Sequence, residues 1–171
     1  MRNLFSKLLL LAAVVLAGNA LAYKPANLQL VGEATLKIMF WNVYQSRLYT
    51  PSGRFEGYNQ PHAGEYMLEI TYLQNIKSSD LVEQTYKQWQ HLGVPQADVE
   101  PFMEELLNYW PDVSEGDTLS MHVANGRTHF YFNGVLTGEI AEPEFGPMFV
   151  SIWLSPETSQ PKMRKKLLGG V

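Results

Sequence analysis

Residues 116–140, GDTLSMHVANGRTHFYFNGVLTGEI, place two turn signals between stretches with the alternation of β-strands. Asn125-Gly126 and Asn133-Gly134 are both typical of two-residue hairpin loops. A loop at Asn125-Gly126 makes one face mostly apolar, through the pairs Leu119–Phe132, Met121–Phe130 and Val123–Thr128. We expect the opposite face to be polar and solvated; it carries Ser120, His122, Arg127, His129 and Tyr131. The stretch therefore predicts an antiparallel meander with one face in the core.

The flanking segments predict further strands and four helices. Residues 33–40 and 65–73 alternate as half-buried strands do. Asp80, with Glu83 three residues on, has the spacing of a capping box and predicts a helix that ends before Gly93. Further helices are expected from Asp98 to residue 110, over the apolar residues 145–154, and from Pro161 to residue 168. This order predicts an α+β fold with an antiparallel sheet and helices on one face.

The first predicted strand is followed by an irregular segment. Residues 40–44, FWNVY, break the alternation, and Tyr44, Ser46 and Leu48 then form a row of mixed polarity. A polar side chain on a core-facing row is either satisfied at the rim of a packed sheet or part of a cavity wall.

The N-terminus has the features of a secretory signal peptide. Arg2 and Lys7 precede the apolar residues 8–17, and Ala20-Leu21-Ala22 places small residues where a signal peptidase requires them. We expect residues 1–22 to be removed after Ala22, leaving a single domain of residues 23–171 with Tyr23 first. The chain has no cysteine, so neither disulfides nor a lipoprotein anchor are expected. The predicted location is the bacterial periplasm, or outside the cell.

Charge and hydropathy restrict the partners of the mature chain. Without Arg2 and Lys7 the net charge of −4 becomes −6, and no basic cluster remains. These features argue against nucleic acid and against an anionic membrane surface as partners. No second apolar run is long enough to span a bilayer, so no stable membrane insertion is expected.

Motifs for metal, cofactor or covalent chemistry are missing from the sequence. His122 and His129 would face each other across the hairpin, but two ligands do not make a metal site. No Gly-x-Ser-x-Gly turn and no glycine-rich phosphate loop occurs. We therefore predict no metal, no cofactor and no catalytic residues.

Polar residues inside apolar elements are more informative. Ser151 lies in the apolar helix FVSIWL, and Gln84 lies near the apolar edge of its predicted helix. A buried serine often bonds back to the preceding turn, which is the simpler explanation. Alternatively, Ser151, Gln84 and Tyr44 offer hydrogen bonds to a molecule held between helices and sheet.

Several segments together resemble the chalcone isomerase-like family, in its bacterial exported branch. They are VGEATLK and VYQSRLYTP near the start, QWQHLG, FYFNGVLTGEI, and FGPMFVSIWLSPETSQPKMRKKLLG at the end. The resemblance covers essentially the whole mature chain through the order and spacing of these segments. It implies an open-faced β-sandwich, in which helices layer on one side of an antiparallel sheet above an elongated apolar cleft.

The resemblance also implies where site residues should fall. Family members include isomerases that close a chalcone with the help of an arginine, and proteins that bind fatty acids without turnover. The arginine should fall at residues 32–34, which are Gly-Glu-Ala here. Tyr44 replaces the threonine of the enzymes, Lys77 their tyrosine and Gln84 their asparagine, whereas Ser151 keeps a hydroxyl.

These departures favour a non-catalytic binder, because the isomerase mechanism depends on charged groups held around an oxyanion. We predict that a small apolar or amphipathic ligand, such as a fatty acid, contacts Tyr44, Lys77, Gln84 and Ser151. One alternative is an isomerase or lyase that acts on an enone-like substrate with Lys77 as its cation. Another is a structural or protein-interaction module whose cleft is filled by side chains.

Overall fold

A computed structural model describes residues 23–57 and 64–170 of the chain. The predicted signal peptide, residues 1–22, lies outside the described residues, as does part of the glycine- and proline-rich segment 51–64. Within the described part, six strands and four helices follow each other in the order predicted from the sequence.

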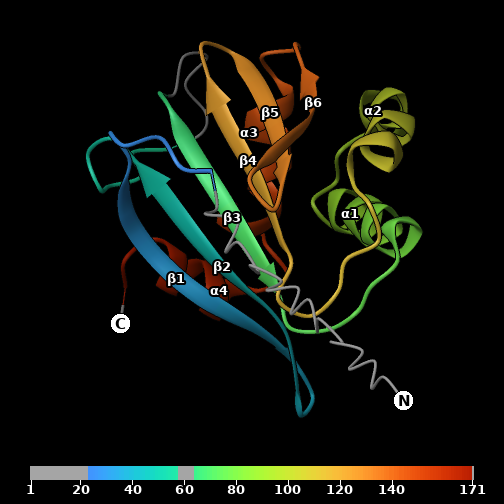
Figure 1. The fold of residues 1–171 in the computed structure, drawn as a ribbon, viewed down its shortest axis with the longest axis horizontal. Helices are drawn as coiled ribbons and strands as arrows, with labels where there is room; N and C mark the ends of the chain where they lie inside the picture. The colour runs from blue at the N-terminus through green and yellow to red at the C-terminus, as the bar shows by residue number, and fades with distance from the viewer. Residues whose placement is uncertain (1–22, 58–63, 171) are drawn as a thin grey trace, which may run out of the picture.

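The strands form a single antiparallel sheet in chain order, with every strand hydrogen-bonded to the next (Figure 1). They are β1 (Gln29–Ile38), β2 (Trp41–Thr50), β3 (Tyr66–Tyr72), β4 (Thr118–Ala124), β5 (Arg127–Phe132) and β6 (Val135–Ile140). Strands that pair in chain order make an open meander with two edges, β1 and β6, and its longest connection, between β3 and β4, contains the first two helices.

The predicted register of the meander is confirmed. Met121 pairs with Phe130, and Val123 pairs with Thr128. Asn125 and Asn133 both have a positive φ, of 54° and 48°, as the first residue of a type I′ hairpin loop requires. The Asn-Gly dipeptides thus fix which residues face the core.

The helices are α1 (Ser78–His91), α2 (Gln96–Tyr109), α3 (Phe145–Leu154) and α4 (Pro161–Leu167). The predicted start of α1 at Asp80 was wrong by two residues. The carboxylate of Asp112 accepts the backbone N–H of Ser78 at 2.8 Å and satisfies the first turn from a distant part of the chain. Because this partner lies 34 residues away, the local capping pattern misplaced the helix start.

All four helices contribute to one hydrophobic core on the same face of the sheet, so the predicted α+β class and layering are confirmed. The meander supplies Phe130, whose ring lies about 6 Å from those of Phe145 and Phe149 on α3. Gly146 lets α3 approach closely, since a Cβ there would lie 2.7 Å from Val123 Cγ2. The family resemblance predicted this arrangement as an open-faced sandwich.

The opposite face of the sheet is less solvated than the alternation predicted. His122 is only 7% exposed, and its Nε2 lies 2.9 Å from Glu65 Oε1. Tyr23 stacks on Tyr131 with ring centroids 4.0 Å apart. The prediction that His122 faces away from the main core is right, but the expectation of a solvated face is wrong there, because residues before β1 and Glu65 cover it.

The β1–β2 hairpin projects beyond the body of the sheet (Figure 1). Ile38 pairs with Trp41, so Met39 and Phe40 form the turn. These four neighbours are all exposed, with exposed fractions of 56% for Ile38, 85% for Met39, 94% for Phe40 and 68% for Trp41. The irregularity at residues 40–44 therefore marks a hairpin turn that presents large apolar side chains to solvent.

Candidate ligand-binding site

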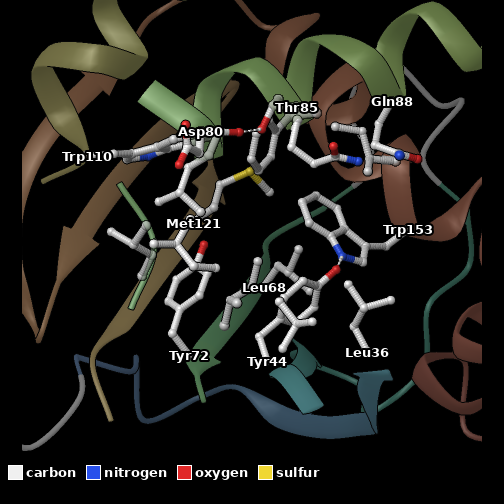
Figure 2. A pocket seen from close by; sticks show the side chains of 18 of the residues that line it. Leu36, Tyr44, Leu68, Tyr72, Asp80, Thr85, Gln88, Trp110, Met121 and Trp153 are labelled. Atoms are coloured by element: carbon white, nitrogen blue, oxygen red, sulfur yellow. Dashed lines mark hydrogen bonds between the residues drawn. The ribbon is translucent and has the colours of Figure 1, made fainter. Parts of the chain in front are cut away.

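A cavity of about 380 Å³ lies between the sheet and helices α1 and α3. This volume falls within the range of small-molecule sites. Its wall is mainly apolar: Leu68 of β3 and Met121 of β4 lie on the sheet side, and Ile152 comes from α3. Figure 2 shows the aromatic side chains that surround it. The predicted cleft is therefore present as a cavity and is not filled by side chains.

Tyr44 of β2 is one of two tyrosines that rise from the sheet into this cavity (Figure 2). Its hydroxyl oxygen accepts a hydrogen bond from Trp153 Nε1 of α3 at 2.9 Å. Burial raises the pKa of Tyr44 to about 12, against a smaller opposing effect of that hydrogen bond. The phenol is therefore neutral at physiological pH, and its own proton remains free to be donated.

Tyr72 of β3 is the second tyrosine, and sequence reasoning missed it. It lies opposite Tyr44 in the β2–β3 register, with ring centroids 6.1 Å apart in an edge arrangement. Only 6% of Tyr72 is exposed, and its hydroxyl makes no hydrogen bond to residues 23–57 and 64–170, but it is not among the fully occluded polar atoms and so stays open to the cavity. Figure 2 shows that hydroxyl pointing into the cavity. Burial, followed by the nearby Tyr44, raises the pKa of Tyr72 above its ordinary value, so this group is also a neutral donor.

Polar side chains from α1 and the segment before α4 form another part of the wall. Gln84 and Gln88 of α1 lie there, and Ser159 donates its hydroxyl proton to Gln88 Oε1 at 2.7 Å. Asp80, in the first turn of α1, is exposed at the rim. These groups are mostly neutral amides and hydroxyls, which suit an uncharged polar group better than an ion.

The structure brings together only two of the four residues predicted to bind the ligand. Tyr44 and Gln84 line the cavity. Lys77 is exposed immediately before α1 and is not part of the wall. Ser151 is not part of it either, since its Oγ donates to the backbone oxygen of Met148 at 2.6 Å, as the simpler explanation expected. Ser46, which follows Tyr44 in the row of mixed polarity, is fully buried, and its Oγ donates to the backbone oxygen of Ala34.

Comparison with known proteins shows the family to which this chain belongs. A family model described as chalcone isomerase-like matches residues 12–169 of the chain. The chain belongs to the chalcone isomerase-like family. The family predicted from the sequence is thereby confirmed, and its bacterial exported branch stays a prediction.

Two individual proteins are similar to this chalcone isomerase-like chain. A protein of Haemophilus influenzae (strain ATCC 51907 / DSM 11121 / KW20 / Rd), described as uncharacterized, is 24% identical over 144 residues, which are 84% of this chain and 69% of that protein. The crystal structure of the fatty-acid binding protein AtFAP1 of Arabidopsis thaliana superposes with a TM-score of 0.64 at 9% identity. That superposition covers 86% of this chain and 89% of AtFAP1, and it shows a shared fold.

Of residues 32–34, where the chalcone isomerase-like resemblance led us to look for an arginine, neither Gly32 nor Glu33 places a cation in the cavity, and the third, Ala34, is an uncharged residue of the core. A Cβ on Gly32 would lie 2.1 Å from the backbone oxygen of Lys166, because the end of α4 packs directly on β1. Glu33 faces the other side of the sheet, where Arg47 binds both Glu33 and Glu69 at 3.1 and 3.2 Å. The nearby guanidinium is thus held on the face away from the cavity.

Neither a metal cluster nor a membrane-spanning helix is present in the part of the chain that the structure describes. No group of three or more His, Cys, Asp and Glu side chains there could hold a metal ion. His122 and His129, considered as a pair from the sequence, have ring centroids 6.4 Å apart, and each has a glutamate partner. No helix among the described residues is long and apolar enough to cross a bilayer.

Proposed function

We propose that this chalcone isomerase-like protein binds a small apolar or amphipathic molecule in the cavity between its sheet and its helices, without converting it. The observation that carries this proposal is the mainly apolar cavity into which the hydroxyl of Tyr72 points without a hydrogen bond to a described residue. This hydroxyl is open to the cavity, so without a ligand only water there can accept its hydrogen bond. A bound molecule with an acceptor atom accepts that bond instead and removes apolar surface from water.

The shared fold with AtFAP1, a fatty-acid binding protein, supports a binding role. Isomerisation of the chalcone isomerase type instead needs a positive charge at the developing oxyanion. The candidate for that charge was Lys77, which is exposed outside the cavity wall. The wall therefore offers holding contacts and neutral donors, which is what a binder requires.

We further propose that the protein works after export, in the periplasm or outside the cell. The proposal rests on the leader-like residues 1–22, with their basic start, apolar run and small residues before the predicted cleavage point. Sequencing the N-terminus of protein isolated from the periplasmic fraction tests it. Tyr23 is expected as the first residue, and full-length protein retained in the cytoplasm would contradict the proposal.

The binding proposal is tested by mass spectrometry of lipids extracted from the purified protein. We compare the wild type with Leu36→Trp, which places a bulky ring in the cavity wall, and with Leu30→Trp on the same strand. Leu30 is about half exposed and is not part of the wall, so it is the matched control. A co-purified apolar molecule should be present in the wild type and Leu30→Trp and be lost from Leu36→Trp. A wild-type extract without any such molecule, or equal amounts in all three proteins, would contradict the proposal.

A further inference from the structure

The donors around the cavity specify the chemistry of its ligand. The Tyr72 hydroxyl points into the cavity and has no acceptor in the described chain, and the proton of the Tyr44 hydroxyl is likewise free. The indole N–H of Trp110, whose ring also lies in the wall, has no partner among the described residues either, but its nitrogen is buried out of reach of the cavity. The wall thus offers two hydroxyl donors without acceptors among the described residues, and a ligand with an oxygen or nitrogen acceptor satisfies them.

The same wall gives no counter-charge for an anion. Among the described residues that line the cavity, the one formally charged side chain is Asp80, a carboxylate at the rim. Arg47 is held by Glu33 and Glu69 on the far side of the sheet. Burying a carboxylate beside apolar groups without a cation is costly, because its hydration is lost and no opposite charge replaces it.

We propose, building on the binding function above, that the ligand is an uncharged amphiphile with a carbonyl or similar neutral acceptor oxygen that bonds Tyr72, with Tyr44 beside it. Its apolar chain extends over Leu68, Met121 and Ile152. A fatty acid then binds in its protonated form, and its apparent affinity falls as the pH rises above the pKa of its carboxyl group. This narrows the ligand predicted from the sequence, a small apolar or amphipathic molecule such as a fatty acid, to an uncharged one.

Calorimetry with chain-matched ligands tests this proposal. Protein stripped of lipid is titrated with methyl undecyl ketone and with dodecanoic acid, each at a pH below and above the pKa of the acid. We expect ketone affinity to be independent of pH, and the affinity for the acid to fall at least tenfold at the higher pH. Tyr72→Phe should weaken ketone binding about two- to tenfold, the value of one neutral hydrogen bond.

The controls separate this proposal from the binding function itself. Tyr131→Phe removes a tyrosine hydroxyl on the opposite face of the sheet and should leave ketone affinity unchanged. If the acid binds with the same affinity as the ketone at both pH values, the proposal of an uncharged ligand is overturned, while the binding function stands. Unchanged ketone affinity in a folded Tyr72→Phe protein would overturn it as well. Failure of both ligands to bind would contradict the binding function.

The tip of the β1–β2 hairpin carries a second, independent inference. Met39 adopts a φ of 55°, a conformation that favours glycine, and it is followed by the almost fully exposed Phe40. A glycine would relieve the backbone and remove exposed apolar surface, so this turn is not optimised for stability alone. Ile38, at the base of the tip, is also part of the cavity wall.

We propose that Ile38, Met39, Phe40 and Trp41, together called the apolar tip, dock reversibly into the surface of an uncharged phospholipid bilayer. Four side chains at the end of a hairpin are far fewer than the roughly 20–30 residues per partner of a stable protein interface. A group of this size suits a membrane anchor that inserts only about 5–10 Å into the bilayer surface. Tryptophan and lysine, here Trp41 and Lys37, are both typical of residues at that interface. Docking there brings one side of the cavity wall next to the bilayer.

Flotation with vesicles of phosphatidylcholine tests the docking proposal. Wild-type protein should float with the vesicles, and the double variant Phe40→Asp/Trp41→Asp should lose most of that binding. Val135→Asp/Leu136→Asp changes the exposed apolar pair of β6 and should bind as the wild type does. No flotation of the wild type, or equal flotation of the tip variant, would overturn the proposal. Lipid-independent self-association that the tip variant abolishes would overturn it in favour of a protein contact.

Discussion

The hydrogen bond between Trp153 and Tyr44 fixes the helix α3 above the sheet at the cavity, and its removal has a calculable cost. Trp153→Phe removes the donor of the 2.9 Å bond, and Tyr44→Phe removes its acceptor. The net value of such a bond is about 0.5–1.5 kcal/mol. Tyr44→Phe alone should cost about 1–3 kcal/mol of unfolding free energy, because it leaves the indole N–H without a partner in a largely buried position.

A double-mutant cycle isolates this contact. We expect a coupling free energy of about 0.5–1.5 kcal/mol between Tyr44→Phe and Trp153→Phe, measured by urea unfolding of protein stripped of lipid. The matched control pairs Tyr44→Phe with Trp110→Phe. The Trp110 indole also belongs to the cavity wall but makes no hydrogen bond to a described residue. Its cycle should be additive within about 0.5 kcal/mol.

Two results would refute this reasoning. Additive effects of Tyr44→Phe and Trp153→Phe would mean that the bond does not contribute to stability in solution. Equal coupling in the control cycle would mean that the cavity residues are coupled through general repacking and not through this bond.

Three further predictions concern the core, the alkaline limit of stability and the packing of α4. Phe130→Ala should lower the unfolding free energy by about 3–5 kcal/mol in urea titrations, and the partly exposed Phe132→Ala by clearly less; equal costs would contradict the observed burial. Because burial raises the pKa of Tyr44 to about 12 from an unfolded value near 10, stability should fall between these pH values by up to about 1.4 kcal/mol per pH unit for this group. The fall should be shallower in Tyr44→Phe, and an equal slope in both proteins would contradict the assignment. Gly32→Ala should lower the melting temperature, because a Cβ there meets α4 backbone, whereas Gly64→Ala meets nothing within 4 Å and should not; equal melting temperatures would contradict the close packing.

The meander was predictable because the signals that define it are local. Two Asn-Gly dipeptides set the hairpin loops, and the alternation of the flanking residues then leaves a single register that puts Met121 and Phe130 on the core face. The apolar helix 145–154 was likewise predicted with its observed bounds. In each case the deciding residues lie within a few positions of one another.

The features that could not be predicted depend on contacts between distant parts of the chain. His122 was expected to be solvated because its neighbours alternate, but Glu65, 57 residues earlier, covers it. Ser151 appeared to be a site residue because it is polar in an apolar helix, yet the backbone oxygen three residues earlier satisfies it.

Tyr72 was missed for a similar reason. It faces the cavity because β3 pairs with β2 so that Tyr72 lies opposite Tyr44. A long segment rich in glycine and proline, residues 51–64, separates the two strands, and it gives no turn signal from which their register could be read. Because Tyr44 and Tyr72 both lie on core-facing rows, matching the core faces of β2 and β3 pairs them.

Photoaffinity labelling shows whether a ligand occupies the cavity between sheet and helices. A dodecyl ketone with a photoreactive diazirine on its chain is bound, irradiated and located by mass spectrometry of the digested protein. Labelled residues should lie on β2, β3 and α3, with Tyr44, Leu68 and Ile152 among them, and an excess of unlabelled ketone should suppress the labelling. Labelling confined to the opposite face of the sheet, around Tyr49 and Met67, would contradict the claim.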